Sequence, residues 1–300
     1  MQKKYIVGFA LFLFFLNILC WQEVFVLSGP RYLQVDFFDV GQGDSAFIRT
    51  PEGHNILIDG GPDQSVLARL NTVLPFWDKS LDLVILTHPE KDHMQGLLDV
   101  LQRYQVDYFL WTGVIKNDAE NKKLADILKR LESSTQNSML AALSPEKIKV
   151  ITAVAGQEIK AGNVLIDTLY PLEDVSGKEL KNTSNDTCVV SRLIYGKISF
   201  LFTGDISSTA EKDLVSDGFN LQSDVLKVAH HGSKYSTSDI FLAAVEPKMA
   251  VISVGAKNTY GHPTPETLQR LEKFGIKIFR TDKDGDVNFI SDGKNIKVIK

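Results

Sequence analysis

Cysteine is nearly absent from this chain of 300 residues, which contains only Cys20 and Cys188. Cys20 lies in an apolar run near the start, so Cys188 has no partner in the rest of the chain and no disulfide is expected there. A metal site built from several thiolates is excluded for the same reason. Basic residues are not in excess either, because the formal net charge is −4. A global field that attracts nucleic acid is therefore excluded, and such binding would need a local patch or metal ions.

Low-complexity tracts, internal repeats and the G-x-S-x-G motif of serine hydrolases are also missing. Ser233 follows two histidines but lies outside any such motif, so a serine-hydrolase mechanism is rejected. The hydrophobic content of 44% is enough to bury a full core. No linker rich in proline, glycine or serine separates the two halves, which favours a single domain over residues 31–300.

Residues 1–30 differ from the rest of the chain. Two lysines precede a nearly continuous apolar run at residues 5–21, and no small residues suited to signal-peptide cleavage follow it. The run and the apolar residues after it are long enough to cross a bilayer of roughly 30 Å at about 1.5 Å per residue. We therefore expect residues 1–30 to be an uncleaved single-pass membrane anchor, with the rest of the chain outside the cell. The alternative is a cleaved segment and a secreted domain.

From Leu33 onward, short apolar runs alternate with segments of helical spacing. Strands are expected at residues 33–38, 44–50, 55–61, 83–86, 108–111, 147–154, 163–171, 188–196, 198–205, 224–233 and 249–255. Helices are expected at residues 65–74, 94–104, 118–134, 208–218, 237–245 and 264–275, and a hairpin at 277–293. Strands precede strand–helix units in each half, which favours an α/β fold with two sheets packed face to face and helices outside.

Polar side chains follow four of the expected strands at the point where each strand ends. They are Asp59, His88, Asp205 and the pair His230–His231. If these strands lie side by side, their ends share one edge, where α/β proteins bind ligands. The side chains would then be sufficient for two metal ions with a shared ligand. Imidazole and carboxylate ligands together suit zinc, manganese or iron.

The segment that follows the expected strand at residues 83–86 reads THPEKDH, residues 87–93. His88, Glu90 and Asp92 alternate along an extended chain and can therefore point the same way, while His93 begins a helix. The alternative is a helix-capping arrangement without a metal. His230 and His231 cannot both point the same way on a strand, so one is expected to be a ligand and the other to face the substrate.

Five motifs resemble, in the same order, those of the metallo-β-lactamase domain of ComEC-type competence proteins. They read VDFFDVGQGDSAFIRTPEGHNILIDGG, THPEKDHMQGL, FLFTGD, VLKVAHHGSKYSTS and NTYGHPTPETLQRL. The resemblance runs from about Tyr32 to the C-terminus, and it implies an αββα four-layer sandwich and a metal-dependent hydrolase. In this family the domain is exported and is thought to degrade DNA during uptake. A whole ComEC protein also has a multi-span channel, whose function is not transferred to this chain.

The resemblance also implies ligands for two divalent ions, Mn²⁺ or Zn²⁺. The residues expected to bind them are His88, Glu90, Asp92, His93, Asp205, His230 and His231. Asp205 would bridge the ions, and His230 is favoured over His231 as the late histidine ligand. We expect Asp92 to orient the attacking hydroxide and His262 to act at the leaving oxygen as an acid or phosphate donor. Residues expected near the ligands or substrate are Asp59, Asn185, Thr187, Ser233 and Asn258.

Two departures from the general family pattern bear on the metal. Glu90 stands where the general signature has its second histidine, and no histidine lies between His93 and His230. The segment NTSNDTCVV occupies the region of the missing histidine, and its candidates to face the site are Asn182, Asn185, Asp186 and Thr187. A site with fewer imidazoles and more oxygen favours manganese over zinc, and it allows for a single ion.

The function expected from these observations is that of a phosphodiesterase or nuclease acting on extracellular DNA. One alternative is a hydrolase of another small ester or phosphodiester. The other is a membrane-tethered, non-catalytic binding protein whose metal site has degenerated. The expected partners are DNA or another phosphodiester and, through residues 1–30, the membrane, while no protein partner is indicated.

Overall fold

The computed structural model describes residues 2–27, 32–133, 147–180 and 184–299. The chain divides into two units, residues 1–32 and 33–300. The first unit contains helix α1, Gln2–Leu27. Among the described residues, no helix is long and apolar enough to cross a membrane, for which about 20 apolar residues are needed. This finding corrects the prediction of a single-pass anchor that holds the domain outside the cell.

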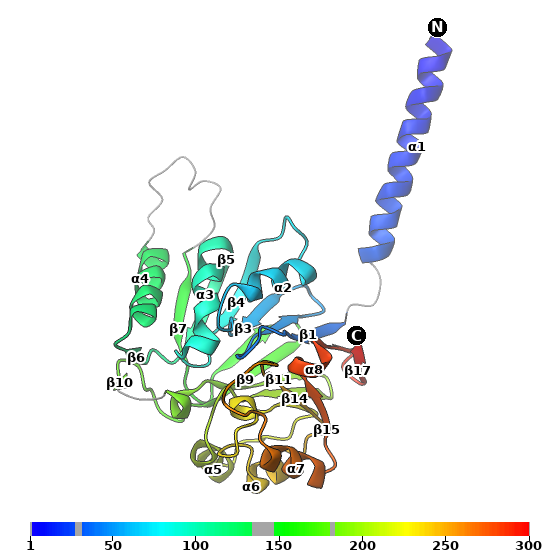
Figure 1. The fold of residues 1–300 in the computed structure, drawn as a ribbon. Helices are drawn as coiled ribbons and strands as arrows, with labels where there is room; N and C mark the ends of the chain where they lie inside the picture. Colours follow the sequence, from blue (N-terminus) through cyan, green and yellow to red (C-terminus); the bar gives the residue numbers. More distant parts are fainter. Residues whose placement is uncertain (1, 28–31, 134–146, 181–183, 300) are drawn as a thin grey trace. The chain divides into compact units, whose positions relative to one another are not determined.

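The second unit contains two large sheets (Figure 1). The first sheet has the order β17-β16-β1-β2-β3-β4-β5-β7 and the second has the order β15-β14-β13-β12-β11-β9-β8. The strands of the first sheet are β1 Leu33–Phe37, β2 Ala46–Arg49, β3 Asn55–Ile58, β4 Ser80–Ile85, β5 Gln105–Trp111, β7 Lys149–Thr152, β16 Val287–Ser291 and β17 Ile296–Ile299. Those of the second are β8 Glu158–Ala161, β9 Val164–Tyr170, β11 Val190–Tyr195, β12 Ile198–Phe202, β13 Val225–Lys227, β14 Met249–Ile252 and β15 Lys277–Arg280. A short pair, β6 Ile115–Lys116 and β10 Glu179–Leu180, forms a separate sheet.

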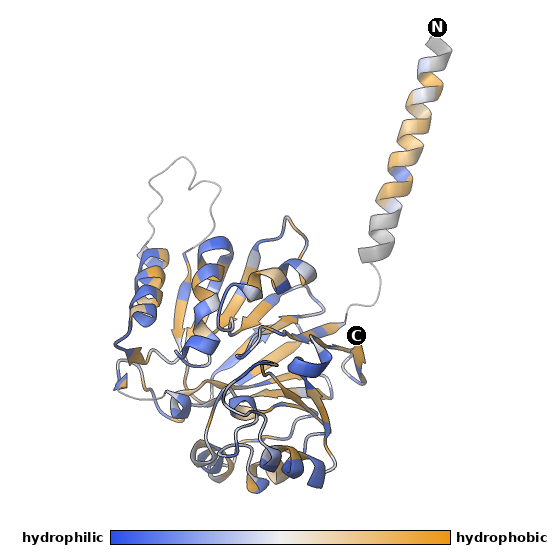
Figure 2. Ribbon diagram, in the orientation of Figure 1, coloured by the Kyte–Doolittle hydropathy of each residue, from blue (hydrophilic) through white to orange (hydrophobic). Residues whose placement is uncertain are grey.

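Helices cover the outer face of each sheet (Figure 1). Those packed on the first sheet are α2 Ser65–Val73, α3 Lys91–Arg103 and α4 Ala119–Ser133, and those on the second are α5 Ser208–Asp217, α6 Asp239–Val245 and α7 Pro265–Lys273. Side chains alternate between the faces of each strand, because successive Cβ atoms of a strand point to opposite sides. Phe37 and Phe202 therefore meet between the sheets, with ring centroids 5.6 Å apart, while Leu201 packs outward under α5. The αββα sandwich is confirmed, and Figure 2 shows its strands as mainly hydrophobic.

The expected hairpin at 277–293 is wrong. β15 pairs in parallel with β14 in the second sheet, whereas β16 pairs with β1 in the first. The turn residues between them form the short helix α8, Thr281–Asp284, which carries the chain from one sheet to the other. The strand period alone cannot distinguish a return to the same sheet from a crossing between sheets.

Parallel strand pairs bring the polar strand ends together. β3 lies beside β4, with Ile58 opposite Ile85, and β12 lies beside β13, with Leu201 opposite Leu226. All four strands therefore release the chain at corresponding edges of their sheets. The segments that follow them, together with the loop after β1, build the site described next.

Candidate metal centre

His93 lies in the first turn of helix α3 and is completely buried. Its Nδ1 lies 2.8 Å from Oδ2 of Asp59, and the Thr87 amide and hydroxyl both donate to the Asp59 carboxylate. Asp59 therefore fixes the ring and leaves Nε2 pointing the other way, 3.3 Å from Oδ1 of Asp205. A carboxylate on one ring nitrogen is the usual support for a histidine whose other nitrogen binds a metal.

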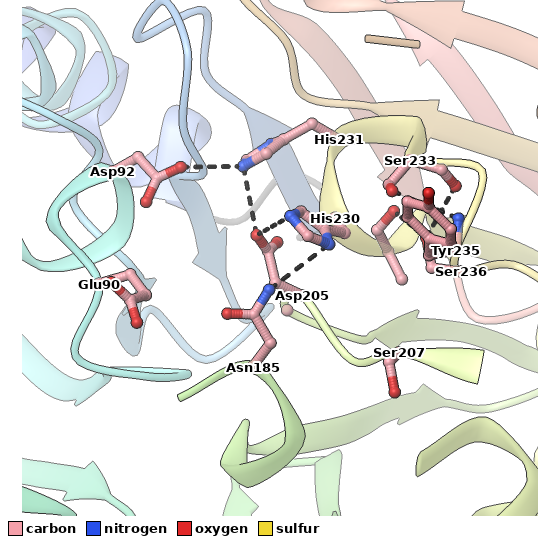
Figure 3. Close-up of polar contacts among 12 residues, drawn as sticks. Glu90, Asp92, Asn185, Asp205, Ser207, His230, His231, Ser233, Tyr235 and Ser236 are labelled. Carbon is pink, nitrogen blue, oxygen red and sulfur yellow. Dashed lines mark hydrogen bonds and ion pairs between the residues drawn. The ribbon is translucent and has the colours of Figure 1, made fainter. Parts of the chain in front are cut away.

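His231 is held in the same manner by a different partner. Its Nδ1 lies 2.8 Å from the carbonyl oxygen of Ser253, which fixes this nitrogen as the donor. Nε2 is directed at two carboxylates and lies 3.2 Å from Oδ2 of Asp92 and 3.5 Å from Oδ2 of Asp205 (Figure 3). The side chain is buried, whereas that of His230 is 36% exposed and its Nε2 lies 3.9 Å from Asp205. The geometry therefore favours His231 over His230 as the histidine that could bind a metal ion together with Asp92 and Asp205.

Three residues of the site have an unusual backbone. Asp59, His230 and His231 have φ angles of 57°, 51° and 53°. For residues with a Cβ atom this left-handed conformation costs roughly 1–2 kcal/mol each. The two histidines therefore do not continue strand β13, and both rings can approach Asp205. Strain of this kind is retained where the surroundings enforce a functional geometry.

His88 lies beside His93, with ring centroids 4.2 Å apart. Its Nδ1 is 3.1 Å from the Thr87 hydroxyl, and its buried Nε2 makes no hydrogen bond with any described residue. Burial lowers the pKa of His88 to about 3, and the neighbouring His93 ring adds to this effect. His88 is therefore neutral at physiological pH and presents a lone pair, which is the form that binds metal ions.

Asp92, His93, Asp205 and His231 each offer one ligand atom, and these atoms all lie within 4.8 Å of one another. We call these four residues the outer group, because three of them line an open cavity. Within the part of the chain that the structure describes, Nε2 of His93 and Oδ1 of Asp205 are buried without a hydrogen bond. Orphaned buried polar atoms are costly and call for a missing partner. The nitrogen and oxygen donors of the outer group fit a divalent cation.

Asp44, Asp59 and His93 form a second set with ligand atoms equally close together, which we call the inner group. Asp44 follows the glycine-rich turn after β1, and a Cβ atom at Gly43 would collide with the carbonyl oxygen of Asp92. The Asp44 carboxylate pairs with the buried ammonium of Lys227, which also contacts the carbonyl oxygen of Gly204 at 3.3 Å. Lys227 thus neutralises the Asp44 carboxylate, although Oδ1 of Asp44 makes no hydrogen bond with the described residues and lies 3.3 Å from Nδ1 of His231.

The charges of these groups depend on one another. Burial alone would lower the pKa of His93, but the carboxylates of Asp205, Asp44 and Asp59 outweigh it and raise this pKa well above the usual value. Burial opposes ionisation of Asp205 as well, yet His231 and His93 hold its pKa well below the ordinary range. In this structure the imidazolium rings supply positive charge to the carboxylates, which is the role that a bound cation would take over.

Glu90 stands apart from the outer group, although it lines the same cavity. Its Oε2 lies 2.6 Å from Nζ of Lys116, and its Oε1 accepts hydrogen bonds from the amide and the hydroxyl of Ser184. Both oxygens therefore tie the start of α3 to strand β6 and to the segment before the 3₁₀ turn Asn185–Thr187. The expectation that Glu90 binds a metal finds no support in this geometry.

The other expected residues divide between the cavity and local turns. Asn185 lines the cavity, with Nδ2 3.4 Å from Nδ1 of His230, and His262 lines it as well. Thr187 instead donates to the carbonyl oxygen of Ser184, and the Ser233 hydroxyl accepts from the amide of Tyr235, away from the carboxylates (Figure 3). Asn258 braces the loop that carries His262, and Asn182 lies outside the described residues.

Several site residues escaped the sequence analysis as individual candidates. Asp44 lies in the quoted motif DVGQGD, but its acidic neighbours made it one of several equivalent candidates. Lys227 interrupts the apolar sequence around strand β13. A lysine within such a run was the one signal in the sequence for a buried charge. Tyr260, Gln42 and Lys116 line a cavity of about 570 Å³. They come from three distant loops or edges, so nothing in their own spacing indicates a shared site.

The sequence model of the metallo-beta-lactamase superfamily matches residues 38–256. The chain belongs to the metallo-beta-lactamase superfamily. Among curated proteins it is 30% identical over 274 residues to ComE operon protein 3 of Bacillus subtilis, and the alignment covers 85% of this chain and 33% of that protein. It is 32% identical to Competence protein ComA of Neisseria gonorrhoeae over 85% of this chain and 32% of that protein. The resemblance to competence proteins is confirmed, and the chain spans about one third of the length of these relatives.

Solved structures support the superfamily fold. The metallo-beta-lactamase fold protein YhfI of Bacillus subtilis aligns with a TM-score of 0.55 at 14% identity, over 86% of this chain and 100% of that one. Igni18, a metallo hydrolase of Ignicoccus hospitalis, aligns with a TM-score of 0.51 at 16% identity, over 85% and 98%. At these identities the likeness establishes the fold alone. Together with the outer group, the superfamily assignment identifies a metal-dependent hydrolase fold with a site suited to divalent cations.

Proposed function

We propose that this protein is a metal-dependent phosphodiesterase that cleaves DNA. The observation that carries the proposal is the shared orientation of His88, His93 and His231. Each ring has Nδ1 held by a hydroxyl, a carboxylate or a carbonyl oxygen, and Nε2 of His93 and His231 faces carboxylates. Three preoriented imidazoles beside Asp92 and Asp205 are costly to assemble unless they serve a cation.

The residues proposed to hold divalent ions are Asp92, His93, Asp205 and His231, with His88 available to a second ion next to His93. A bound divalent ion would supply Lewis acidity and lower the pKa of a coordinated water toward about 7. Manganese remains the proposed metal, because this chain lacks two histidines of the general family pattern, the second of its signature and the one expected between His93 and His230. DNA as the substrate is proposed from the resemblance to the exported domain of ComEC-type competence proteins, and the competence-protein relatives support that resemblance.

Other side chains of the cavity are proposed to act on the phosphodiester. The Asp92 side chain is 32% exposed and faces the cavity, so its free oxygen can orient the attacking water. Burial, and then the nearby His230 ring, lowers the pKa of His262, and its buried Nδ1 has no hydrogen-bond partner among the described residues. His262 lines the cavity and is proposed to contact an oxygen of the leaving group through its imidazole ring, although not through the buried Nδ1.

Metal content and hydrolysis, measured on the same preparation of the full chain, test this proposal. The protein is stripped with EDTA, reloaded with Mn²⁺ or Zn²⁺, and analysed by elemental mass spectrometry. We expect near-stoichiometric metal and metal-dependent hydrolysis of both bis(p-nitrophenyl) phosphate and linear DNA. Hydrolysis of the small diester alone would retain the phosphodiesterase and remove DNA as the substrate. A protein that takes up no metal and cleaves neither substrate is not a hydrolase of this kind.

A further inference from the structure

Aromatic rings lead outward from the outer group to the rim of the cavity. The rings of His231 and His230 lie 6.3 Å apart, those of His230 and His262 lie 5.7 Å apart, and those of His262 and Tyr260 lie 6.0 Å apart. The last pair is nearly parallel, with an interplanar angle of 14°. Tyr260 is 70% exposed, so one face of this ring is backed by His262 and much of the rest is open to a ligand.

The loop that carries Tyr260 is fixed by its own hydrogen bonds. Nδ2 of Asn258 donates to the carbonyl oxygens of Gly255 and His262, and Oδ1 accepts from the His262 amide. The Gly255 amide donates to Oε1 of Gln42, another residue that lines the cavity. The tyrosine is therefore presented on a braced loop, which lowers the entropic cost of using it as a contact surface.

Fixed positive charge is scarce in this cavity. Among the described residues that line it, Lys116 is the one lysine or arginine, and its ammonium is paired with Glu90 at 2.6 Å. Affinity for a polyanion that rests on phosphate contacts alone would therefore be weak. An exposed aromatic face next to a phosphodiester site offers a different source of binding energy, since nucleobases stack on such faces with little dependence on sequence.

Resting on the proposed function, we infer that Tyr260, backed by His262, is a stacking platform for a nucleobase adjacent to the cleaved phosphodiester. Because bases in a duplex are already stacked on their neighbours, the platform selects single-stranded polynucleotide or an unpaired end. Tyr260 thus determines the substrate class through stacking, while the outer group and the cavity residues near it act on the phosphate. Since stacking is weakly screened, the Michaelis constant should depend little on salt.

The test compares two ten-nucleotide oligomers, one of thymidylate and one with abasic sites throughout, hydrolysed by the full chain loaded with Mn²⁺. For the wild type we expect a KM about tenfold lower for the base-bearing oligomer, which corresponds to about 1.4 kcal/mol. Tyr260→Ala should remove this preference by raising KM for thymidylate, and Tyr260→Phe should restore it. Tyr235→Ala is the matched control, because Tyr235 is 68% exposed and does not line the cavity.

Equal KM values for the two oligomers in the wild type would overturn the inference, as would a Tyr260→Ala effect of the same size on both. If neither oligomer is hydrolysed, the proposed nuclease function has failed, and calorimetric binding of the same oligomers decides the stacking question alone. A preference for the base-bearing oligomer that Tyr260→Ala removes supports the platform. Equal binding, or none, refutes it.

Discussion

The outer and inner groups share His93 and contain the same types of side chain, yet they differ in what satisfies them. In the inner group Asp44 is paired with Lys227, and Asp59 accepts from Thr87 and holds His93. In the outer group Nε2 of His93 and Oδ1 of Asp205 form an ion pair at 3.3 Å but no hydrogen bond. Proximity of carboxylates and imidazoles is thus the same in both, but only in the inner group is a carboxylate in direct contact with an ammonium; Lys227 lies 3.8 Å from Oδ1 of Asp205.

This difference separates a supporting network from a candidate metal site. A buried carboxylate that already has an ammonium partner gains little from a cation, whereas an orphaned nitrogen and oxygen gain a great deal. The inner group therefore orients and charges the residues that the outer group presents. Four substitutions can break or sharpen this comparison.

The largest effect is expected from Asp205→Ala in the outer group. The Asp205 carboxylate contacts His93 and His231 and lies at the centre of the cluster, so its loss should reduce metal occupancy and catalysis together. We expect kcat/KM to fall by about 10³-fold or more, as when several kcal/mol of electrostatic stabilisation is removed. Elemental analysis and phosphodiester hydrolysis, measured on the same sample, check this. Retained turnover at normal metal content would remove the outer group as the active site.

A large loss of stability is expected from Lys227→Met in the inner group. The substitution leaves Asp44 buried without its ammonium partner, which typically costs about 3–5 kcal/mol of folding free energy. Denaturant unfolding of the metal-free protein measures this change. The double variant Asp44→Asn with Lys227→Met should regain much of the loss, because no uncompensated charge remains. A single variant as stable as the wild type would show that the two charges are not coupled.

An intermediate effect is expected from Asp59→Asn, which changes the support of His93 and leaves the outer group intact. An amide is a weaker acceptor for the Nδ1 proton, so the His93 ring becomes a poorer ligand. We expect metal affinity to fall by about 10- to 100-fold while the protein still folds. Competition with a chelator of known affinity gives the value, and circular dichroism gives the folding control. An unchanged metal affinity would show that the inner group does not contribute to metal binding by the outer group.

Much of this arrangement could be predicted from the sequence, and the rest required spatial information. The polar residues that follow strands β3, β4, β12 and β13 indicated a site at one edge of the sheets, because parallel strands end on the same side of a sheet. The sequence analysis favoured His230 over His231, whereas the geometry favours His231, because the choice depends on two consecutive positive φ angles that no strand pattern contains. Lys227 was missed because the sequence around it does not indicate which acidic residue pairs with it.

The crossing of the chain from β15 to β16 was also beyond the sequence pattern. Residues 277–293 carry the alternation and the turn residues of a hairpin, and the short helix α8 that separates the strands has only four residues. The two strands do not pair with each other because each pairs with another strand. β15 pairs with β14 in the second sheet, and β16 pairs with β1 in the first. Tertiary pairing therefore overrode the local signal.

The smallest effect is expected from Glu90→Gln, which tests a residue beside the outer group that the sequence assigned to the metal. In the structure both Glu90 oxygens are engaged with Lys116 and Ser184. We therefore expect metal stoichiometry to be unchanged and stability to fall by about 1 kcal/mol or less, the usual range for a partly exposed ion pair. Lys116→Met is the matched control, because it removes the same pair and leaves the carboxylate in place. Loss of metal in Glu90→Gln but not in Lys116→Met would return Glu90 to the ligand set and extend the outer group across the cavity.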